Sequence, residues 1–382
     1  MTMPLDDLLR SMAQAKGSDL HFKAGRPPLV RLNGDLRAFQ CPPWSGEDIL
    51  NALTPVMSER AKTAFEQTNE ADLSYACPGV GRFRINMFRQ RGQPGAVLRL
   101  IPAKTPTIEA MGLPLVLNTI ADNVNGLVLV TGPTGSGKST TLAAMIQHIN
   151  TTRPVHILTI EDPIEFTYED QKACINQREL GNDTETLQKA LRAALRQDPD
   201  ILLMGEMRDQ ETINFGITAA ETGHLVFATL HTNDAPQTIE RIMDILPAEA
   251  KTAVRIQLSA LLRGIVCQRL VKRADGSGRV AALEILVMSG TIQQLVAEGK
   301  LATIPKAMEE GEFYKMQTFN QALYNLAKEG TITEETALAS TSQPDGLRLM
   351  FKGVVRGSGA AGSGGDAKKE DAETSKADRI TF

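Results

Sequence analysis

One stretch of nine residues constrains the fold of this chain more than any other. It matches the phosphate-binding loop pattern GxxxxGK[ST] and consists of Gly132, Pro133, Thr134, Gly135, Ser136, Gly137, Lys138, Ser139 and Thr140. Residues 126–131 before it form an apolar run of strand length, and apolar residues after it recur at helical spacing. A strand, a glycine-rich loop and a helix are the context that this pattern needs. We therefore expect a nucleotide-binding α/β domain around the loop.

Each residue type in the loop has a chemical reason. Glycines let backbone N–H groups converge on phosphate oxygens without side-chain clashes, and the helix N-terminus adds partial positive charge. Lys138 is expected to pair with the β- and γ-phosphates, and the Ser139 hydroxyl to ligate Mg²⁺. The sequence therefore predicts ATP and Mg²⁺ as ligands.

Residues 113–352 alternate strand and helix patterns, which predicts a parallel sheet with right-handed crossovers. The strand candidates are residues 127–131, 155–160, 200–204 and 225–230. Ligands bind at the carboxyl ends of such strands. The chemically reactive candidates all follow a strand end: Lys138, the segment 161–165, Glu206 and His231.

Residues 1–100 instead suggest a small α+β domain. Helices are expected over 5–16 and most of 49–65, and strands over 19–22, 29–32, 82–88 and 97–101, with a turn at Asn33-Gly34-Asp35. Prolines indicate a linker over 101–112. A glycine- and serine-rich segment followed by charged residues predicts a disordered tail over 353–382.

Two acidic groups are candidates for hydrolytic chemistry. The run from Asp198 to Glu206 resembles a Walker-B strand, whose terminal acid, here Glu206, holds Mg²⁺ through water or polarises the attacking water. Glu161, Asp162 and Glu165 lie within five positions, and such close carboxylates repel one another unless a cation or water chemistry occupies them. We expect Glu165 to be the general base. The alternative is an ordinary charged loop.

Histidines and arginines complete the set of candidates. His231 is expected to sense the γ-phosphate from a strand end, and His224 is a further candidate. A guanidinium on the developing charge accelerates phosphoryl transfer and is often supplied by a neighbouring subunit. The arginine candidates for this role crowd the end of the first domain or lie on the helix before the Walker-B strand: Arg82, Arg84, Arg89, Arg91 and Arg99 in the first group, and Arg192 and Arg196 in the second. Ordinary surface arginines are the alternative.

Composition disfavours other classes of protein. A net charge of −4 and an aromatic content of 4% argue against a nucleic-acid translocase, which grips its substrate with positive grooves and stacking side chains. Four widely spaced cysteines form no CxxC pair, so no zinc cluster is expected. The N-terminus lacks signal-peptide features, and no apolar run reaches membrane-spanning length. We expect a cytoplasmic protein that reaches a membrane only through a partner.

Taken together, these motifs resemble the type II/type IV secretion ATPases, and within them the PilT/PilU family of type IV pilus retraction ATPases. The resemblance covers residues 5 to about 350. It is carried by the P-loop, by Gly17-Ser18-Asp19-Leu20-His21, by Arg82-Phe83-Arg84, and by residues 158–166, 191–209, 220–224 and 231–232.

The resemblance implies a fold, an assembly and residue roles. It implies a PAS-like N-terminal domain, a RecA-like ATPase domain, and a hexameric ring with ATP between the two domains. The family's roles fall on Glu165 as general base, Glu206 as Walker-B acid, the arginine pairs Arg84/Arg99 and Arg192/Arg196, and His224 and His231 of the His box. The implied activity is pilus disassembly for twitching motility at the cytoplasmic face of the inner membrane. The implied partners are an inner-membrane platform protein and a paralogous retraction ATPase.

Some segments depart from the retraction pattern. Residues 291–296 read Thr-Ile-Gln-Gln-Leu-Val, where the family carries an Ala-Ile-Arg-Asn-Leu-like helix, so Gln293 replaces its arginine. Residues 316–326 and 347–352 resemble PilU more, whereas 205–209 resemble PilT. The sequence therefore leaves open a principal retraction motor, an accessory PilU-like subunit with weak turnover, or a pilus assembly or type II secretion ATPase.

Overall fold

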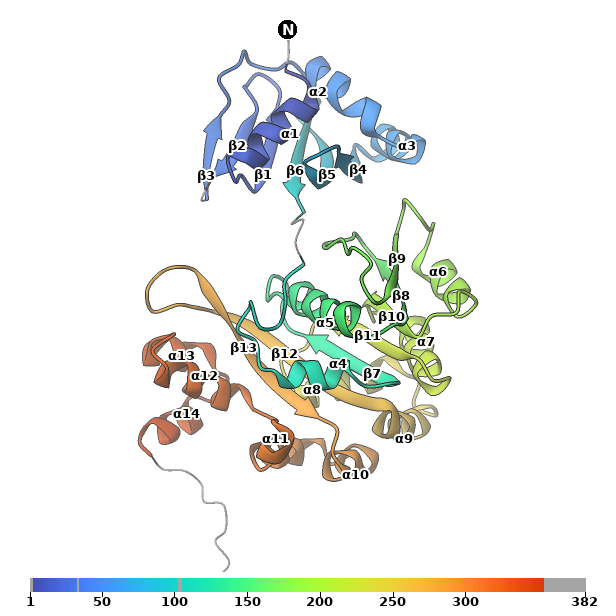
Figure 1. Ribbon diagram of the computed structural model, residues 1–382, viewed down its shortest axis with the longest axis vertical. Coiled ribbons are helices and arrows are strands. Elements are labelled where there is room, and N and C mark those ends of the chain that lie inside the picture. The colour runs from blue at the N-terminus through green and yellow to red at the C-terminus, as the bar shows by residue number, and fades with distance from the viewer. Residues whose placement is uncertain (1–2, 33, 102–104, 354–382) are drawn as a thin grey trace, which may run out of the picture.

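The computed structural model describes residues 3–32, 34–101 and 105–353, which form two domains, each built on its own sheet (Figure 1). Asn33 of the expected hairpin turn, part of the expected linker and residues 354–382 of the expected tail lie outside the described residues. Within the described ranges, no helix is both long and apolar enough to cross a membrane.

The N-terminal domain is a six-stranded antiparallel sheet in the order β3-β2-β1-β6-β5-β4. Its strands are β1 (Asp19–Lys23), β2 (Leu29–Leu32), β3 (Asp35–Ala38), β4 (Glu70–Cys77), β5 (Gly81–Gln90) and β6 (Gln93–Leu100). Alternation gives the sheet two different faces. In β5, Phe83, Ile85 and Met87 are fully buried, while Arg82 and Arg84 point to the opposite face.

Three helices pack on the buried face of this sheet: α1 (Leu5–Gln14), α2 (Gly46–Leu53) and α3 (Glu59–Thr68). The expected helical structure over most of 49–65 is confirmed, but it is divided between two helices. A 3₁₀ turn at Thr54–Val56 contains a proline, and the extended residues Met57 and Ser58 then separate α2 from α3. Ser58 caps the second helix, because its side chain accepts a hydrogen bond from the Ala61 N–H.

The C-terminal domain has a seven-stranded sheet in the order β13-β12-β7-β11-β10-β8-β9. Its strands are β7 (Gly126–Thr131), β8 (His156–Glu161), β9 (Cys174–Glu179), β10 (Ile201–Glu206), β11 (Leu225–Leu230), β12 (Leu262–Lys272) and β13 (Arg279–Val287). Six strands are parallel, and β13 alone runs antiparallel to its neighbour. The four predicted strands and the parallel sheet are confirmed, whereas β9 and β12 were not predicted.

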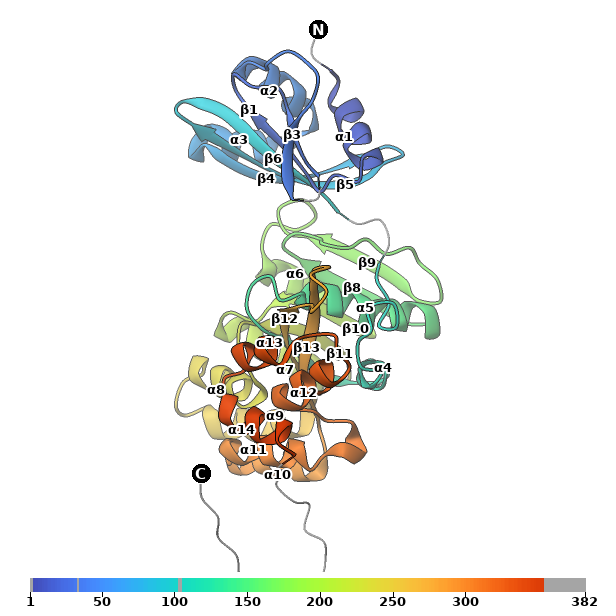
Figure 2. The same cartoon turned by 90° about the vertical axis from the view of Figure 1, so that its left-hand side faces the viewer.

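Helices cover both faces of this sheet (Figures 1 and 2). One face packs against α4 (Val116–Ala121) and α5 (Lys138–Thr152), together with Ile108 and Leu113 from the segment before α4. The other packs against α6 (Leu187–Ala194), α7 (Gln210–Glu221), α8 (Ala235–Ile245), α9 (Lys251–Leu261), α10 (Gly290–Glu298), α11 (Ile304–Glu309) and α12 (Phe319–Lys328). Helices α13 (Glu334–Ser340) and α14 (Pro344–Phe351) pack beside α12. This doubly covered parallel sheet confirms the predicted α/β class.

Candidate functional site

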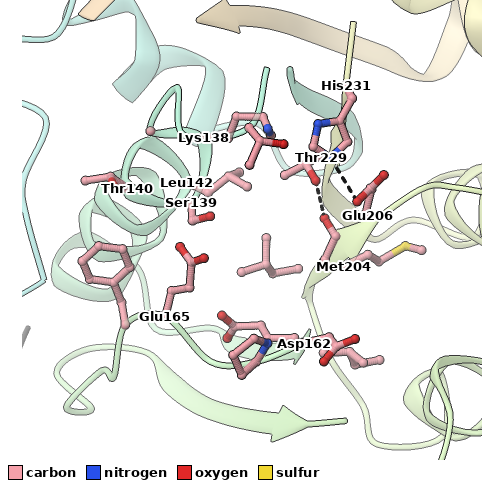
Figure 3. A pocket seen from close by; sticks show the side chains of 18 of the residues that line it. Lys138, Ser139, Thr140, Leu142, Asp162, Glu165, Met204, Glu206, Thr229 and His231 are labelled. Atoms are coloured by element: carbon pink, nitrogen blue, oxygen red, sulfur yellow. Dashed lines mark hydrogen bonds and ion pairs between the residues drawn. The ribbon is translucent and has the colours of Figure 1, made fainter. Parts of the chain in front are cut away.

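A cleft of about 710 Å³ opens at the carboxyl ends of the central parallel strands. The P-loop follows β7, the acidic segment follows β8, Glu206 ends β10, and His231 follows β11. Because these strands are parallel neighbours, their ends meet at one edge of the sheet. Figure 3 shows the result: Lys138 and Ser139 of the P-loop, the acids Asp162 and Glu165, and the pair Glu206 and His231 surround one space.

The P-loop has a backbone shape that favours glycine. Gly137, the residue before α5, has φ of +88°, and Gly132 has φ of +141°. A Cβ atom on Gly132 would lie 2.3 Å from the backbone oxygen of Gln268 in β12. The loop is therefore packed closely against β12, and its N–H groups can face a phosphate at the start of α5.

The side chain of Lys138 is hydrogen-bonded to the backbone of the P-loop. Its Nζ donates hydrogen bonds to the backbone oxygens of Gly132 at 2.9 Å and Pro133 at 3.2 Å. Partial burial lowers the pKa of Lys138, and the nearby carboxylates of Glu206 and Glu165 oppose this effect. The side chain thus lies between the loop and the acids, where a bound polyphosphate would carry its negative charge.

Glu206 is fixed on the other side of the cleft by two basic side chains. Its Oε2 lies 2.8 Å from Nε of Arg208 and 3.2 Å from Nε2 of His231. Thr229 in β11 donates a hydrogen bond of 2.6 Å to the backbone oxygen of Gly205, which ties the end of β10 to its neighbour. Glu206 therefore has a defined position and direct contact with His231, as drawn in Figure 3.

Glu161, the last residue of β8, and Glu165, in the segment that follows, have different surroundings. Oε1 of Glu161 accepts hydrogen bonds from the Thr159 hydroxyl at 2.7 Å and from Gln177 Nε2 at 3.2 Å. Burial raises the pKa of Glu161, although these hydrogen bonds oppose the shift. Glu165 is exposed and points into the cleft, as Figure 3 shows. Of the two, Glu165 is the better placed to take a proton from a water molecule in the cleft.

The side chain of Gln268 in β12 is hydrogen-bonded to the P-loop, a contact that the sequence did not predict. Its Oε1 accepts a hydrogen bond of 2.6 Å from the Thr141 hydroxyl in α5, and its Nε2 donates one of 2.8 Å to the backbone oxygen of Ser136. Gln268 is almost fully buried. Its amide therefore fixes the loop relative to the first turn of α5.

The remaining predicted site residues lie away from the cleft of this chain. His224 precedes β11, at the opposite edge of the sheet, and its Nδ1 lies 3.0 Å from the backbone oxygen of Ala219. Arg84 and Arg99 face each other on β5 and β6, and Arg99 forms an ion pair of 2.7 Å with Asp19.

The second arginine pair is also outside this cleft. Arg192 on α6 forms an exposed ion pair of 3.0 Å with Glu211. Arg196 was expected on the same helix, but α6 ends at Ala194 and Arg196 lies in the turn that follows. None of these four arginines lines the described cleft.

Comparison with known proteins gives the family. Residues 81–338 match the family model described as Type II/IV secretion system protein. The chain is 47% identical over 343 residues to the type IV pilus retraction ATPase PilT of Pseudomonas aeruginosa, a match that covers 90% of this chain and 99% of that protein. The chain belongs to the type II/IV secretion system protein family. It is also 41% identical over 350 residues to the type IV pilus ATPase PilU of the same organism, with 92% of each chain covered.

A solved structure of this PilT/PilU family has the same architecture. The crystal structure of the pilus retraction motor PilT with bound ADP has a TM-score of 0.86 and 45% identity to this chain, and covers 91% of this chain and 100% of that one. The member described here is thus an ATPase with a small N-terminal domain and a RecA-like domain. These comparisons confirm the predicted family and fold class.

Knowledge of the family does not by itself identify every residue of the ATPase cleft. Arg208 lies two positions after Glu206, and its charge next to a Walker-B acid was a usable signal in the sequence. Arg279, the first residue of β13, also lines the cleft, but nothing in its local sequence indicates this position. Gln268 lies on a strand that was not predicted, so its contact with the P-loop required the tertiary structure.

Proposed function

We propose that this chain is the ATP-hydrolysing motor of type IV pilus retraction, working as a homo-hexameric ring. The observation that carries the proposal is the joint presence of Lys138, Glu165 and Glu206 around one cleft in a chain that matches PilT over nearly its full length. The reaction is ATP plus water to ADP plus phosphate, coupled to movement of the domains.

The chain's own residues divide the chemistry among them. The backbone N–H groups of the P-loop, which spans Gly132 to Thr140 and lacks one only at Pro133, and the Lys138 ammonium bind the phosphates. Glu165 takes a proton from the attacking water. His231 reaches Glu206 directly, so a change at the γ-phosphate is passed to the end of β11.

The cleft also offers oxygen donors of the kind that Mg²⁺ prefers, the Ser139 hydroxyl and the Glu206 carboxylate. A bound Mg²⁺ would neutralise charge on the phosphates during transfer. Ser139 would contact it directly and Glu206 partly through water.

The arginines are proposed to act between subunits. Arg84 and Arg99 lie opposite each other on neighbouring strands, so they present two guanidinium groups on one exposed sheet face. From there they would reach a neighbour's γ-phosphate in the ring, with Arg192 and Arg196 as the second pair and His224 as a further contact. Release of that contact on hydrolysis would let the domains move.

The setting follows from the same proposal. The ring would act at the cytoplasmic face of the inner membrane, against a membrane platform protein, and would drive pilin subunits out of the pilus during twitching motility. Nucleic acid is not a proposed partner.

The test is steady-state ATP turnover of the purified chain across protein concentration, with Lys138→Ala as the blank. A ring whose sites are completed between subunits gives specific activity that rises with concentration, because assembly must precede turnover. Specific activity that is independent of concentration would contradict shared sites. Normal turnover by Lys138→Ala would refute the site itself.

One observation favours a second candidate, an accessory PilU-like subunit. Gln293, which replaces the family's arginine, lies exposed on α10, while Ile292 and Val296 of the same helix are buried. The helix is therefore intact, but its outer face lacks that charge. Turnover no greater than the Lys138→Ala blank, in an assembled chain, would support the accessory function.

A further inference from the structure

A buried carboxylate lies at the contact between the two domains. Glu179 is the last residue of β9, and only 2% of it is exposed. It sits beside the segment that carries Glu165, since β8 and β9 pair in register with Glu161 opposite Glu179. Figure 2 shows β9 at the edge of the C-terminal domain that faces the N-terminal sheet.

Four groups donate hydrogen bonds to this carboxylate, two from each domain. From the N-terminal domain, Arg82 Nη2 lies 2.9 Å from Oε2, and the Ser74 hydroxyl lies 2.9 Å from Oε1. From the C-terminal domain, the Ile164 backbone N–H donates to Oε2 at 3.1 Å, and Asn182 Nδ2 donates to Oε1. Arg82 also donates to the Ser74 hydroxyl at 2.8 Å, so the two N-terminal donors are linked to each other.

Both carboxylate oxygens accept hydrogen bonds from both domains, and Oε2 matters most because one of its donors belongs to the segment that carries Glu165. One of its donors is the guanidinium of Arg82, on the polar face of the N-terminal sheet. The other is the amide of Ile164, the buried residue directly before Glu165. Oε2 of Glu179 therefore links Arg82 of the N-terminal domain directly to the backbone that positions the proposed general base.

Moving the domains apart would remove the Arg82 guanidinium from Oε2 of Glu179. A buried carboxylate that loses its cation is strongly destabilised and must gain water or other donors. The cheapest adjustment is for Glu179 to turn toward solvent, which would release the Ile164 amide. The acidic segment would then lose one of its anchors.

We propose that Glu179 is a positioning residue of the hydrolytic site, through which contact with the N-terminal domain places Glu165. The proposal rests on the proposed role of Glu165 as general base. It makes hydrolysis depend on domain arrangement: the base is in place when Arg82 contacts Glu179 and is displaced when that contact opens. Arg82 acts here from within the same chain, unlike the arginines proposed to reach a neighbour.

Arg82→Gln tests this coupling with three measurements on the full chain. We expect kcat for ATP hydrolysis to fall about tenfold, within the roughly hundredfold that a 1 Å misplacement can cost. The affinity for a fluorescent ADP analogue should stay unchanged, since the P-loop is not touched. Amide hydrogen exchange in the peptide that contains Ile164 should become several-fold faster, because its N–H loses a fixed acceptor.

Two further variants make the result specific. Arg82→Lys keeps a cation at Glu179 and should restore most of the turnover and of the protection at Ile164. Arg60→Gln is the matched control: Arg60 also crosses between the domains, to the Gly181 backbone oxygen at 3.4 Å, but does not touch the carboxylate. It should behave as wild type in all three measurements.

The outcomes separate this proposal from the proposed function. Unchanged exchange at Ile164 in Arg82→Gln would overturn the coupling, whatever happens to turnover. Faster exchange without a change in kcat would overturn the positioning role. If the wild-type chain showed no turnover at all, the motor function would fail, while the exchange experiment would still decide whether Arg82 holds the Ile164 amide through Glu179.

Discussion

Carboxylates that are close in sequence can have different chemistry because their surroundings differ. Glu161 is partly buried and hydrogen-bonded, and its pKa is raised because its carboxyl group is removed from solvent, whereas Glu165 is exposed to the cleft. Glu165→Gln removes the proposed base at nearly constant size. We expect kcat to fall by about 10²- to 10⁴-fold, the usual contribution of general base catalysis, with ADP affinity retained. Steady-state kinetics and equilibrium binding of ADP measure both effects.

Glu161→Gln is the matched comparison for this prediction. Its amide oxygen can still accept the hydrogen bonds from Thr159 and Gln177, so its loss of turnover should be far smaller than that of Glu165→Gln. If the two losses were equal, or if Glu161→Gln were the more damaging, the base would have to be reassigned to Glu161.

Gln268 gives a second prediction, about nucleotide binding instead of catalysis. Gln268→Met removes both hydrogen bonds that hold the P-loop to α5, at similar side-chain volume. We expect the Kd for ADP to rise about tenfold, which corresponds to roughly 1.4 kcal/mol, a typical cost for losing buried hydrogen bonds. Titration with a fluorescent ADP analogue measures the change.

The partner residue of Gln268 provides the internal control. Thr141→Val removes only the bond to Oε1, so its effect should be smaller. Because both substitutions act on the same amide, the double variant should be no worse than Gln268→Met alone. Additive losses would show that the two side chains support the loop independently.

Among the secondary-structure elements, Glu284 of β13 joins two helices to the sheet. Its Oε1 accepts a hydrogen bond of 2.9 Å from the N–H of Ala235, the first residue of α8, and its Oε2 accepts one of 3.4 Å from Phe319, the first residue of α12. Burial, with a smaller effect from Asp234, raises the pKa of Glu284 to about 7. The folded protein therefore keeps this proton up to about pH 7, while the unfolded chain loses it near its ordinary value of 4.5.

This difference predicts how stability depends on pH. The folded state binds more protons between these two values, so the free energy of unfolding falls as pH rises from about 4 to 8, by roughly 3 kcal/mol from this group. Glu284→Gln cannot titrate, and its unfolding free energy should change less over the same range. Denaturant unfolding at several pH values measures both slopes. The exposed Glu240 on α8 is the control, because Glu240→Gln should keep the wild-type slope, and an unaltered slope in Glu284→Gln would contradict the prediction.

Elements also show what could be predicted from the sequence and what could not. The strands β7 and β11 are continuous buried apolar runs, and their type and ends were predicted closely. The edge strand β9 was missed because most of its residues are polar and partly exposed. The strand β12 was missed because it follows α9 directly, Leu261 ending one and Leu262 beginning the other, with no turn between them.

The residues of the site also divide into those that local sequence patterns predict and those that they do not. Lys138, Glu165 and Glu206 belong to local patterns that can be recognised along the chain, and the structure brings them together around the cleft. Gln268 contacts the P-loop, which lies more than a hundred positions earlier in the chain. Glu179 contacts Ile164, which lies about fifteen positions earlier. Such contacts depend on how the sheet and domains are assembled, and no local pattern indicates them.

At the scale of the whole molecule, one chain does not bring its predicted arginine pair to its own cleft. Arg84 and Arg99 lie on the exposed sheet face of the N-terminal domain, and neither lines the cleft. A ring in which each subunit contributes arginines to the next one's nucleotide would complete the site through a head-to-tail interface. This arrangement can be tested without a structure of the ring, by combining two inactive variants.

Lys138→Ala and Arg84→Ala should each have little turnover alone, but rings assembled from an equal mixture should recover part of it. A functional interface needs an intact P-loop from one subunit and an intact arginine from the next. With random assembly about a quarter of interfaces meet both conditions, so turnover should recover to about a quarter of wild type. A mixture of Lys138→Ala with Glu165→Gln is the control. Both defects lie in the same cleft of each chain, so no interface is repaired and turnover should stay at the blank. If the arginine mixture stayed at the blank, like the control, the arginine would act within its own chain.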